Sequence, residues 1–93
     1  VNTNQVNSFK LYQNYPNPFN PETNLEFGIS KLGFVSLIIY DVNGKEVATI
    51  VNSSLNPGTY KYSFNGSDLS SGIYFYTLKT DGFSETKRMV LVK

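Results

Sequence analysis

Apolar and polar residues alternate in one segment of this chain after another, and no segment places its apolar residues at helical spacing. Successive side chains of a strand point to opposite faces of a sheet, so alternation predicts half-buried β-strands. In one such segment Leu25, Phe27 and Ile29 share a face, with Glu26 and Gly28 on the other. The expected strands are residues 9–13, 24–29, 34–40, 45–51, 59–64, 72–79 and 83–93.

The amino-acid composition supports the same fold class. Val, Ile, Tyr, Phe and Thr account for 34 of the 93 residues, whereas Ala, the strongest helix former, occurs once. Branched and aromatic side chains fill the pleated surface of a sheet and lose conformational freedom in a helix. With Asn and Ser also abundant and Cys absent, the composition is typical of an extracellular all-β module held together by packing alone.

Turn residues separate the expected strands. Asn43-Gly44 and Asp81-Gly82 are typical of tight hairpin turns, because glycine adopts positive φ angles without strain. Pro16, Pro18 and Pro21 fall within six residues, where they remove backbone donors and restrict the residues before them to extended geometry. We expect this stretch to be a rigid loop whose Asn side chains bond to nearby backbone groups.

Seven short strands without a helix predict a β-sandwich of the immunoglobulin-like or fibronectin type III-like kind. Residues 52–58 and 65–71 are expected to be loops, with Leu69 as an apolar plug in the second. The apolar spacing slips from two to three before Ile50, which predicts a β-bulge in that strand. Tyr74 is the candidate for a corner tyrosine, whose hydroxyl bonds back to the backbone upstream.

The first eight residues are polar, uncharged and without period. We expect residues 1–8 to be a linker tail from a preceding domain and residues 9–93 to form a single monomeric domain. The chain does not begin with Met and opens with no signal-peptide pattern, so we interpret it as a piece of a larger protein cut at Val1.

The residues that are missing exclude several classes of function. Without Cys or His the chain cannot build a thiol nucleophile, a Ser–His pair or a Cys/His zinc site. Eight basic against seven acidic residues give no electrostatic footprint for nucleic acid or an anionic membrane. The longest apolar runs are a few residues, too short to span a bilayer. We therefore expect no enzyme activity, cofactor, metal site, nucleic-acid partner or membrane span.

Two groups of side chains leave an alternative open. The acidic residues sit mostly in turns, where they cap backbone groups, although calcium could bind near Asp41 or Asp68. Tyr15 and Phe19 are expected to cover one end of the sandwich, but a rigid loop could also present them to a sugar. The tyrosines of residues 60–76 are expected to be core or cross-strand pairs, with an exposed carbohydrate platform as the alternative.

Four motifs in series carry a resemblance to a known family: YPNPFNP at residues 15–21, VxLxIYDxxGKxV at 35–47, LxxGIYFY at 69–76 and KRM at 87–89. Together they resemble the C-terminal sorting domain of type IX (Por) secretion, which is also described as an Ig-like domain of the flagellar hook-capping type. The resemblance runs from about Phe9 to the end of the chain. It implies a seven-stranded Ig-like sandwich at the C-terminus of a secreted or cell-surface protein of the Bacteroidetes and related phyla.

The resemblance also implies partners and a site. The cargo domain would precede this module in the same chain, and the outer-membrane translocation machinery would read the module after passage through the periplasm. A sortase-like peptidase would then remove it, with the cleavage region before Phe9. Carried over by position, the sorting signal would fall on Gly72, Tyr74, Gly82, Lys87, Arg88, Val90, Leu91, Val92 and Lys93.

The sequence supports three functions from different classes. The first is the sorting module, whose last strand, with an exposed edge, would pair with a receptor by β-strand addition. The second is a carbohydrate-binding or spacer module of a glycan-active enzyme, which predicts an exposed aromatic row. The third is a structural or adhesive unit that assembles by strand exchange. Without the family resemblance, Lys87-Arg88 would simply be an edge-strand device against aggregation.

Overall fold

The computed structural model describes residues 8–93, and in this range the alternating segments form strands joined by turns and loops. The strands other than β4 bury alternate residues on one face, as the alternation predicts. The strands are β1 (Lys10–Leu11), β2 (Glu22–Ile29), β3 (Gly33–Tyr40), β4 (Glu46–Leu55), β5 (Gly58–Asn65), β6 (Gly72–Thr80) and β7 (Phe83–Leu91).

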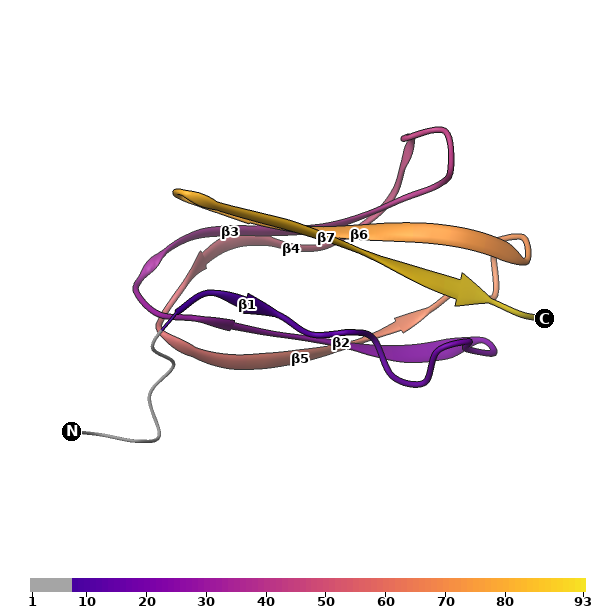
Figure 1. Cartoon of the computed structure of the whole chain (residues 1–93), viewed down its shortest axis with the longest axis horizontal. Helices are drawn as coiled ribbons and strands as arrows, with labels where there is room; N and C mark the ends of the chain where they lie inside the picture. Colours follow the sequence, from indigo (N-terminus) through magenta and orange to yellow (C-terminus); the bar gives the residue numbers. More distant parts are fainter. Residues whose placement is uncertain (1–7) are drawn as a thin grey trace.

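The described strands pair antiparallel in two sheets, one of order β1-β2-β5 and one of order β4-β3-β6-β7 (Figure 1). This is the three-on-four strand order of a fibronectin type III-like sandwich, and it confirms the predicted all-β fold class. Within residues 8–93 no helix is long and apolar enough to cross a membrane.

The core lies between the two sheets and is built from their inward faces. In β2, Leu25, Phe27 and Ile29 are completely buried, and burying each such side chain stabilises the fold by roughly 1.5–3 kcal/mol. Phe27 stacks on Tyr60 and Tyr62 of β5, with ring centroids 5.5 and 6.0 Å apart. The predicted core placement of these two tyrosines is confirmed.

The edge strand β4 differs from its prediction at one end. Residues 52–55, expected to be part of a loop, continue β4 and pair with Gly33–Ser36 of β3. Their polar sequence carries no alternation, because side chains on an edge strand are largely solvated, so pairing rather than pattern extends the strand. The predicted bulge is confirmed by a register shift: Leu37 pairs with Val51 and Ile38 with Thr49, which leaves Ile50 between them.

The proline-rich stretch, residues 15–21, is a loop as predicted and is called the proline loop below. Its three X–Pro peptide bonds are cis. The two aromatic residues of the loop separate: Phe19 is buried, whereas Tyr15 is 78% exposed. The prediction that both cover the sandwich is therefore right for Phe19 and wrong for Tyr15, because the backbone of Tyr15 pairs with Asn24 while its ring points outward.

The first and last strands of the chain are shorter than predicted. β1 is limited to Lys10–Leu11, and β7 ends at Leu91, so Val92 and Lys93 follow the strand. The molecule is elongated, and the described chain begins at the end opposite to the one at which β7 finishes (Figure 1). The expected linker falls largely on residues 1–7, which lie outside the described range.

Candidate functional site

The residues predicted to carry the sorting signal lie on β6, β7 and the two residues that follow. Gly72 lies opposite Leu91 in the register of β6 and β7, at the end of the sandwich where the chain finishes. Gly82 lies in the turn at the other end of the same hairpin. The structure therefore brings together Gly72, Tyr74, Val90, Leu91, Val92 and Lys93, places Lys87 and Arg88 in the middle of β7, and leaves Gly82 apart.

Residues 90–93, called the C-terminal segment below, are bound on one side by the proline loop. The Phe19 amide donates to the Val90 carbonyl at 2.9 Å, and the Val92 amide donates to the Phe19 carbonyl at 3.0 Å. The Val90 amide donates to Oδ1 of Asn17 at 2.9 Å. The loop thus adds a short parallel bridge to β7 and covers its open edge here.

This bond corrects the prediction for the loop asparagines. Asn17 was expected to bond to nearby backbone, but its side chain accepts a hydrogen bond from Val90, 73 residues away. Asn14, just before the loop, does bond locally, since Nδ2 of its side chain donates to the Pro16 carbonyl at 3.1 Å. The sequence pattern favours local bonds, and the docking of the loop on β7 decides otherwise for Asn17.

The side chains beneath the C-terminal segment pack closely. Phe19 and Leu91 are each 1% exposed. A Cβ placed on Gly66 would lie 3.1 Å from Leu91 and 3.3 Å from Phe19, so the backbone at Gly66 approaches both side chains. The Gly66 amide also donates to the Pro21 carbonyl at 2.8 Å. Buried contacts therefore hold the strand end in addition to its hydrogen bonds.

The loop between β5 and β6 binds the final residue from the other side. The Lys93 amide donates to Oγ of Ser71 at 3.0 Å, and Nζ of Lys93 donates to the Ser67 carbonyl. The loop is itself ordered by the Asn65 side chain, which accepts from the Ser67 amide at 2.8 Å. The C-terminal segment is therefore held between two loops that are far apart in the sequence.

Tyr74 closes the corner between the two sheets, as predicted. It is 7% exposed, and its hydroxyl donates to the carbonyl of Ser70 at 2.7 Å, four residues upstream. Leu69 packs against the core beside this corner, which confirms its prediction as an apolar plug. Tyr74 is therefore a structural support of the loop that binds the C-terminal segment.

The two glycines of the predicted signal have backbone roles. Gly72 has a φ of +154° at the start of β6, and Gly82 has a φ of +84° in the hairpin turn. Neither would bring an added Cβ within 4 Å of another group, so the φ angle rather than space favours glycine. The identity of these residues sets the shape of the β6–β7 hairpin.

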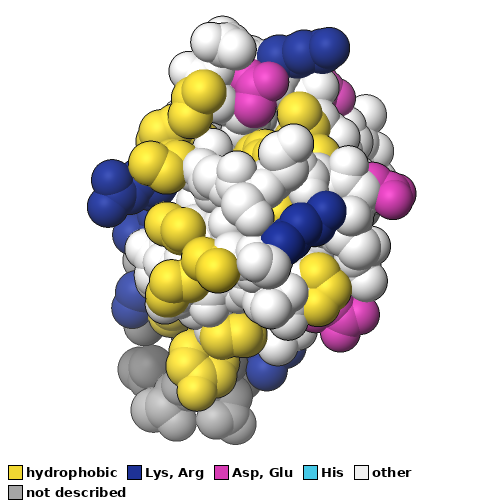
Figure 2. All heavy atoms as spheres, turned by 90° about the vertical axis from the view of Figure 1, so that its right-hand side faces the viewer, with side chains coloured by type: hydrophobic (Ala, Val, Ile, Leu, Met, Phe, Trp, Pro, Cys, Tyr) yellow, Lys and Arg dark blue, Asp and Glu magenta, His cyan; other side chains and the backbone are white. Residues whose placement is uncertain are grey.

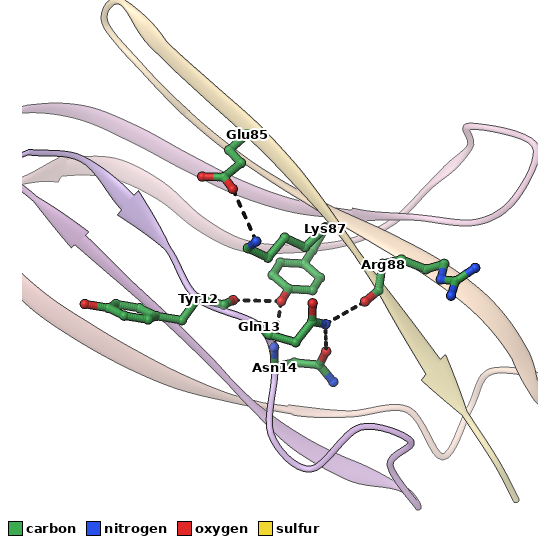
Figure 3. A network of polar contacts seen from close by, with 7 residues as sticks. Tyr12, Gln13, Asn14, Glu85, Lys87 and Arg88 are labelled. Carbon is green, nitrogen blue, oxygen red and sulfur yellow. Dashed lines mark hydrogen bonds and ion pairs between the residues drawn. The ribbon is translucent and has the colours of Figure 1, made fainter.

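Lys87 and Arg88 point to opposite faces of β7, because successive strand residues alternate. Lys87 is half-buried and its Nζ lies 3.3 Å from Oε2 of Glu85 (Figure 3). The side chain of Arg88 is exposed, while its carbonyl accepts from Nε2 of Gln13 at 2.7 Å. Of this pair, Arg88 alone presents its charge on the outer face of the sheet.

Sequence reasoning missed a polar network next to this pair. The Tyr76 hydroxyl donates to the Tyr12 carbonyl at 2.8 Å and accepts from the Asn14 amide at 2.7 Å (Figure 3). Burial raises the pKa of Tyr76 to about 12, the hydrogen bond from Asn14 opposes the rise, and the nearby Glu85 carboxylate adds to it. Alternation identified Tyr76 as a core residue, but nothing local marks the backbone groups that its hydroxyl meets.

The turn carboxylate of Asp41 and the tyrosines of β6, which were alternatives for metal and sugar binding, have structural roles instead. Oδ1 of Asp41 accepts from the amides of Asn43 and Lys45, which confirms its turn-capping role. Within residues 8–93 no three His, Cys, Asp or Glu side chains come together to hold a metal ion. Tyr74 and Tyr76 are buried, so they form no exposed platform for carbohydrate.

Comparison with known proteins gives the family. The profile of the secretion system C-terminal sorting domain matches residues 13–93, and the chain belongs to this family. The family is a C-terminal sorting signal for type IX secretion of cargo proteins, which are secreted or displayed on the cell surface. No curated protein matches the chain.

A solved structure shares the fold. It is PorZ, described as an essential bacterial surface component of the type IX secretion system of Porphyromonas gingivalis. The alignment has a TM-score of 0.58 and 19% sequence identity and covers 89% of this chain. The chain spans 11% of the length of PorZ, so the likeness supports the sandwich fold and nothing about the rest of that protein.

Proposed function

We propose that this sorting domain presents its C-terminal segment as a folded signal, with residues 87–93 and their supports Gly72 and Tyr74 forming the element that the secretion machinery reads. The observation that carries the proposal is that two loops bind the C-terminal segment. The proline loop binds Val90 and Val92, and the β5–β6 loop binds Lys93. Such a hold ties the position of the chain end to the folding of the whole sandwich.

The cargo would be attached at the other end of the module. The described chain begins at the end of the sandwich opposite to the C-terminal segment (Figure 1). A cargo domain joined through a linker of residues 1–8 would therefore leave the C-terminal segment accessible. We place the cut by a sortase-like peptidase before Phe9, since backbone that is paired in a strand is a poor protease substrate.

Recognition of a folded unit modifies the strand-addition hypothesis. Backbone groups that point to the open edge alternate along an antiparallel strand, and in β7 they belong to residues 84, 86, 88 and 90. Gln13, Asn17 and Phe19 already bond to the groups of residues 88–92. A receptor strand could pair without displacing these bonds only near Ser84 and Thr86.

The role is non-catalytic. The chain has no His and no Cys, and among its acidic side chains Asp41 bonds in a turn and Glu85 pairs with Lys87. A sorting module needs no reacting group, because its task is to be bound and later removed. The partners proposed are the outer-membrane machinery of type IX secretion and a peptidase that processes the cargo.

The test is export of a reporter that carries residues 1–93 at its C-terminus in a type IX-competent bacterium. We expect surface or medium localisation for the full module and periplasmic retention for versions that end at Thr86 or at Leu91. The version ending at Leu91 keeps the whole of β7, so its circular dichroism should match that of the full module. Export of both shortened versions at the full level would contradict the proposal.

A further inference from the structure

The two sheets of the sandwich differ in their outer faces. The outer face of the four-stranded sheet carries a contiguous apolar patch, called the outer strip below, which consists of Ile38, Tyr40, Ile73, Phe75 and Val90. The strand register makes it contiguous, because Ile73 lies directly opposite Val90 and Phe75 directly opposite Tyr40. Ile73 is 39% exposed and the others are half-buried.

The outer face of the three-stranded sheet is more polar, and its exposed rings, Tyr12 and Tyr15, lie at its edge, where they pair with Glu26 and Asn24. There the outward side chains of β2 and β5 are polar, namely Glu22, Asn24, Glu26, Thr59, Lys61, Ser63 and Asn65. The contrast matters because a sandwich needs apolar residues only on its inner faces. Apolar residues that gather on one outer face mark a surface that contacts something else.

The outer strip lies at the end of the molecule that carries the C-terminal segment. Val90 belongs to both, and Val92 just beyond it is 48% exposed. Seen from this end, hydrophobic side chains run down one side of the surface, with Lys and Arg side chains beside them (Figure 2). The strip therefore extends the proposed signal sideways across the sheet rather than forming a separate surface elsewhere.

Charges lie on both sides of the strip. Arg88 lies opposite Phe75 and Glu46 opposite Tyr40, so each flanks the strip on an edge strand. Oε2 of Glu46 accepts from the Thr49 hydroxyl at 2.7 Å. Arg88 is exposed, and within residues 8–93 the structure shows no ion pair for it. An apolar surface beside an unpaired cation fits a partner that presents apolar side chains next to a carboxylate.

We propose that the outer strip and Arg88 form a docking surface for a folded protein of the outer-membrane translocation machinery, one with an apolar patch bordered by an acidic group. This proposal rests on the proposed sorting function. Five partly exposed side chains offer a few hundred Å² at most, well below the roughly 800 Å² per partner of a stable complex. The strip is therefore too small for a lasting dimer of this chain, and it suits a transient contact made together with the C-terminal segment.

The test compares two changes on the same outer face, measured by export of the reporter described above. In the test variant Ile73→Thr is combined with Phe75→Thr, because threonine keeps a high β-propensity. The matched control is Phe34→Thr, which removes a 55% exposed ring from β3 at the far end of the same face. We expect the test variant to lose roughly tenfold or more in export and the control to match the original.

A second variant covers the case in which the test variant does not fold, as judged by circular dichroism. Arg88→Glu changes an exposed side chain and should also lower export strongly. Full export of every correctly folded variant of the strip and of Arg88 would overturn the proposal. Failure of the unchanged module to export the reporter would instead overturn the proposed function.

Two further measurements test whether the outer strip instead contacts lipid or a second copy of this chain. Sedimentation with vesicles of phosphatidylglycerol and phosphatidylcholine should show no binding; binding that the test variant loses would mean that the strip contacts lipid, against the proposal. Analytical ultracentrifugation should show one species; a dimer that the test variant loses would assign the strip to self-association, also against it.

Discussion

The two halves of β7 are built differently, although they form one continuous strand. In the first half, residues 83–87, no hydrogen bond reaches the open edge of the strand from within residues 8–93, and the charged side chains of Glu85 and Lys87 point inward. From Arg88 onward the same edge is covered by bonds from Gln13 and the proline loop, and the β5–β6 loop binds Lys93 from the other side. Hydrogen bonds at this edge tie the second half to distant parts of the chain, whereas the first half has the stacking of Phe83 on Phe9.

The difference shows how one strand can be protected against the addition of another strand and still present its end as a signal. Inward charges discourage the addition of another strand, because pairing there would bury an ion pair. The covered half needs no such device, since the Arg88 carbonyl, both backbone groups of Val90 and the Val92 amide are already bonded. Substitutions in the first half are therefore expected to change the free energy of unfolding little. Substitutions in the second half are expected to destabilise the whole sandwich.

The largest expected effect comes from the ring that supports the second half. Phe19→Ala removes a buried side chain whose residue bridges to Leu91 and whose ring lies edge-on to Phe64 at 6.2 Å. We expect a loss of about 3–5 kcal/mol in the free energy of unfolding, measured with a chemical denaturant. Phe83→Ala in the first half, where the ring is half-buried and stacks on Phe9, should cost clearly less. Equal losses would remove the distinction between the halves.

Tyr76→Phe tests the junction between the halves, because Tyr76 pairs with Lys87 and its hydroxyl bonds to the residues that lead into the proline loop. Leaving the Asn14 amide without its partner should cost about 1–3 kcal/mol. The effect should also depend on pH. The pKa of Tyr76 in the folded protein, about 12, lies above the ordinary value of 10.0. The contribution of its hydroxyl to the free energy of unfolding is therefore complete below pH 10 and is lost as the pH rises through 12.

The measurement is the free energy of unfolding of both proteins at pH 8, 10 and 11. The original protein should lose more stability than the Tyr76→Phe variant as the pH rises across this range. Parallel pH profiles for the two proteins would show that the Tyr76 hydroxyl is not the group responsible.

Asn17→Ala should have a smaller effect that is confined to the second half. It removes the side-chain acceptor of the Val90 amide but leaves both backbone bonds of Phe19 in place. We expect a loss of about 1 kcal/mol or less, since this amide can bond to water instead. Faster amide hydrogen exchange at Val90, with unchanged exchange in β2, would confirm that the change is local. A loss of the whole transition would contradict this account.

The smallest effect is expected in the first half, from Lys87→Gln. The ion pair with Glu85 is partly exposed on both sides, and such pairs contribute about 0–1 kcal/mol. Unfolding at low and at high salt should therefore give nearly the same free energy for the variant and the original. A loss of several kcal/mol would mean that the two halves are equally essential to the fold.

The sequence predicts much of this architecture for a simple reason. Alternation depends on neighbours two residues apart, so the inward faces of β2, β3, β5 and β6 could be identified directly. The corner formed by Tyr74 and Ser70 is also local, four residues long. The prediction failed where pairing overrides composition, as in residues 52–55 of β4.

The hold on the C-terminal segment could not be predicted in the same way. The bond between Asn17 and Val90 joins residues 73 positions apart, and an Asn beside prolines bonds equally well to its own loop. Nor does the sequence separate Tyr15 from Phe19, since both are aromatic residues between prolines. Only the docking of the proline loop on β7 decides which ring enters the core.

Amide hydrogen exchange along β7 tests the central claim most directly, because recognition of a folded chain end requires that the end be held. The account predicts strong protection at Val90 and Val92, which bond to the proline loop, and rapid exchange at Ser84 and Thr86 on the open edge. If Val90 and Val92 exchange as rapidly as Thr86, the C-terminal segment is not held, and the folded-signal account is contradicted.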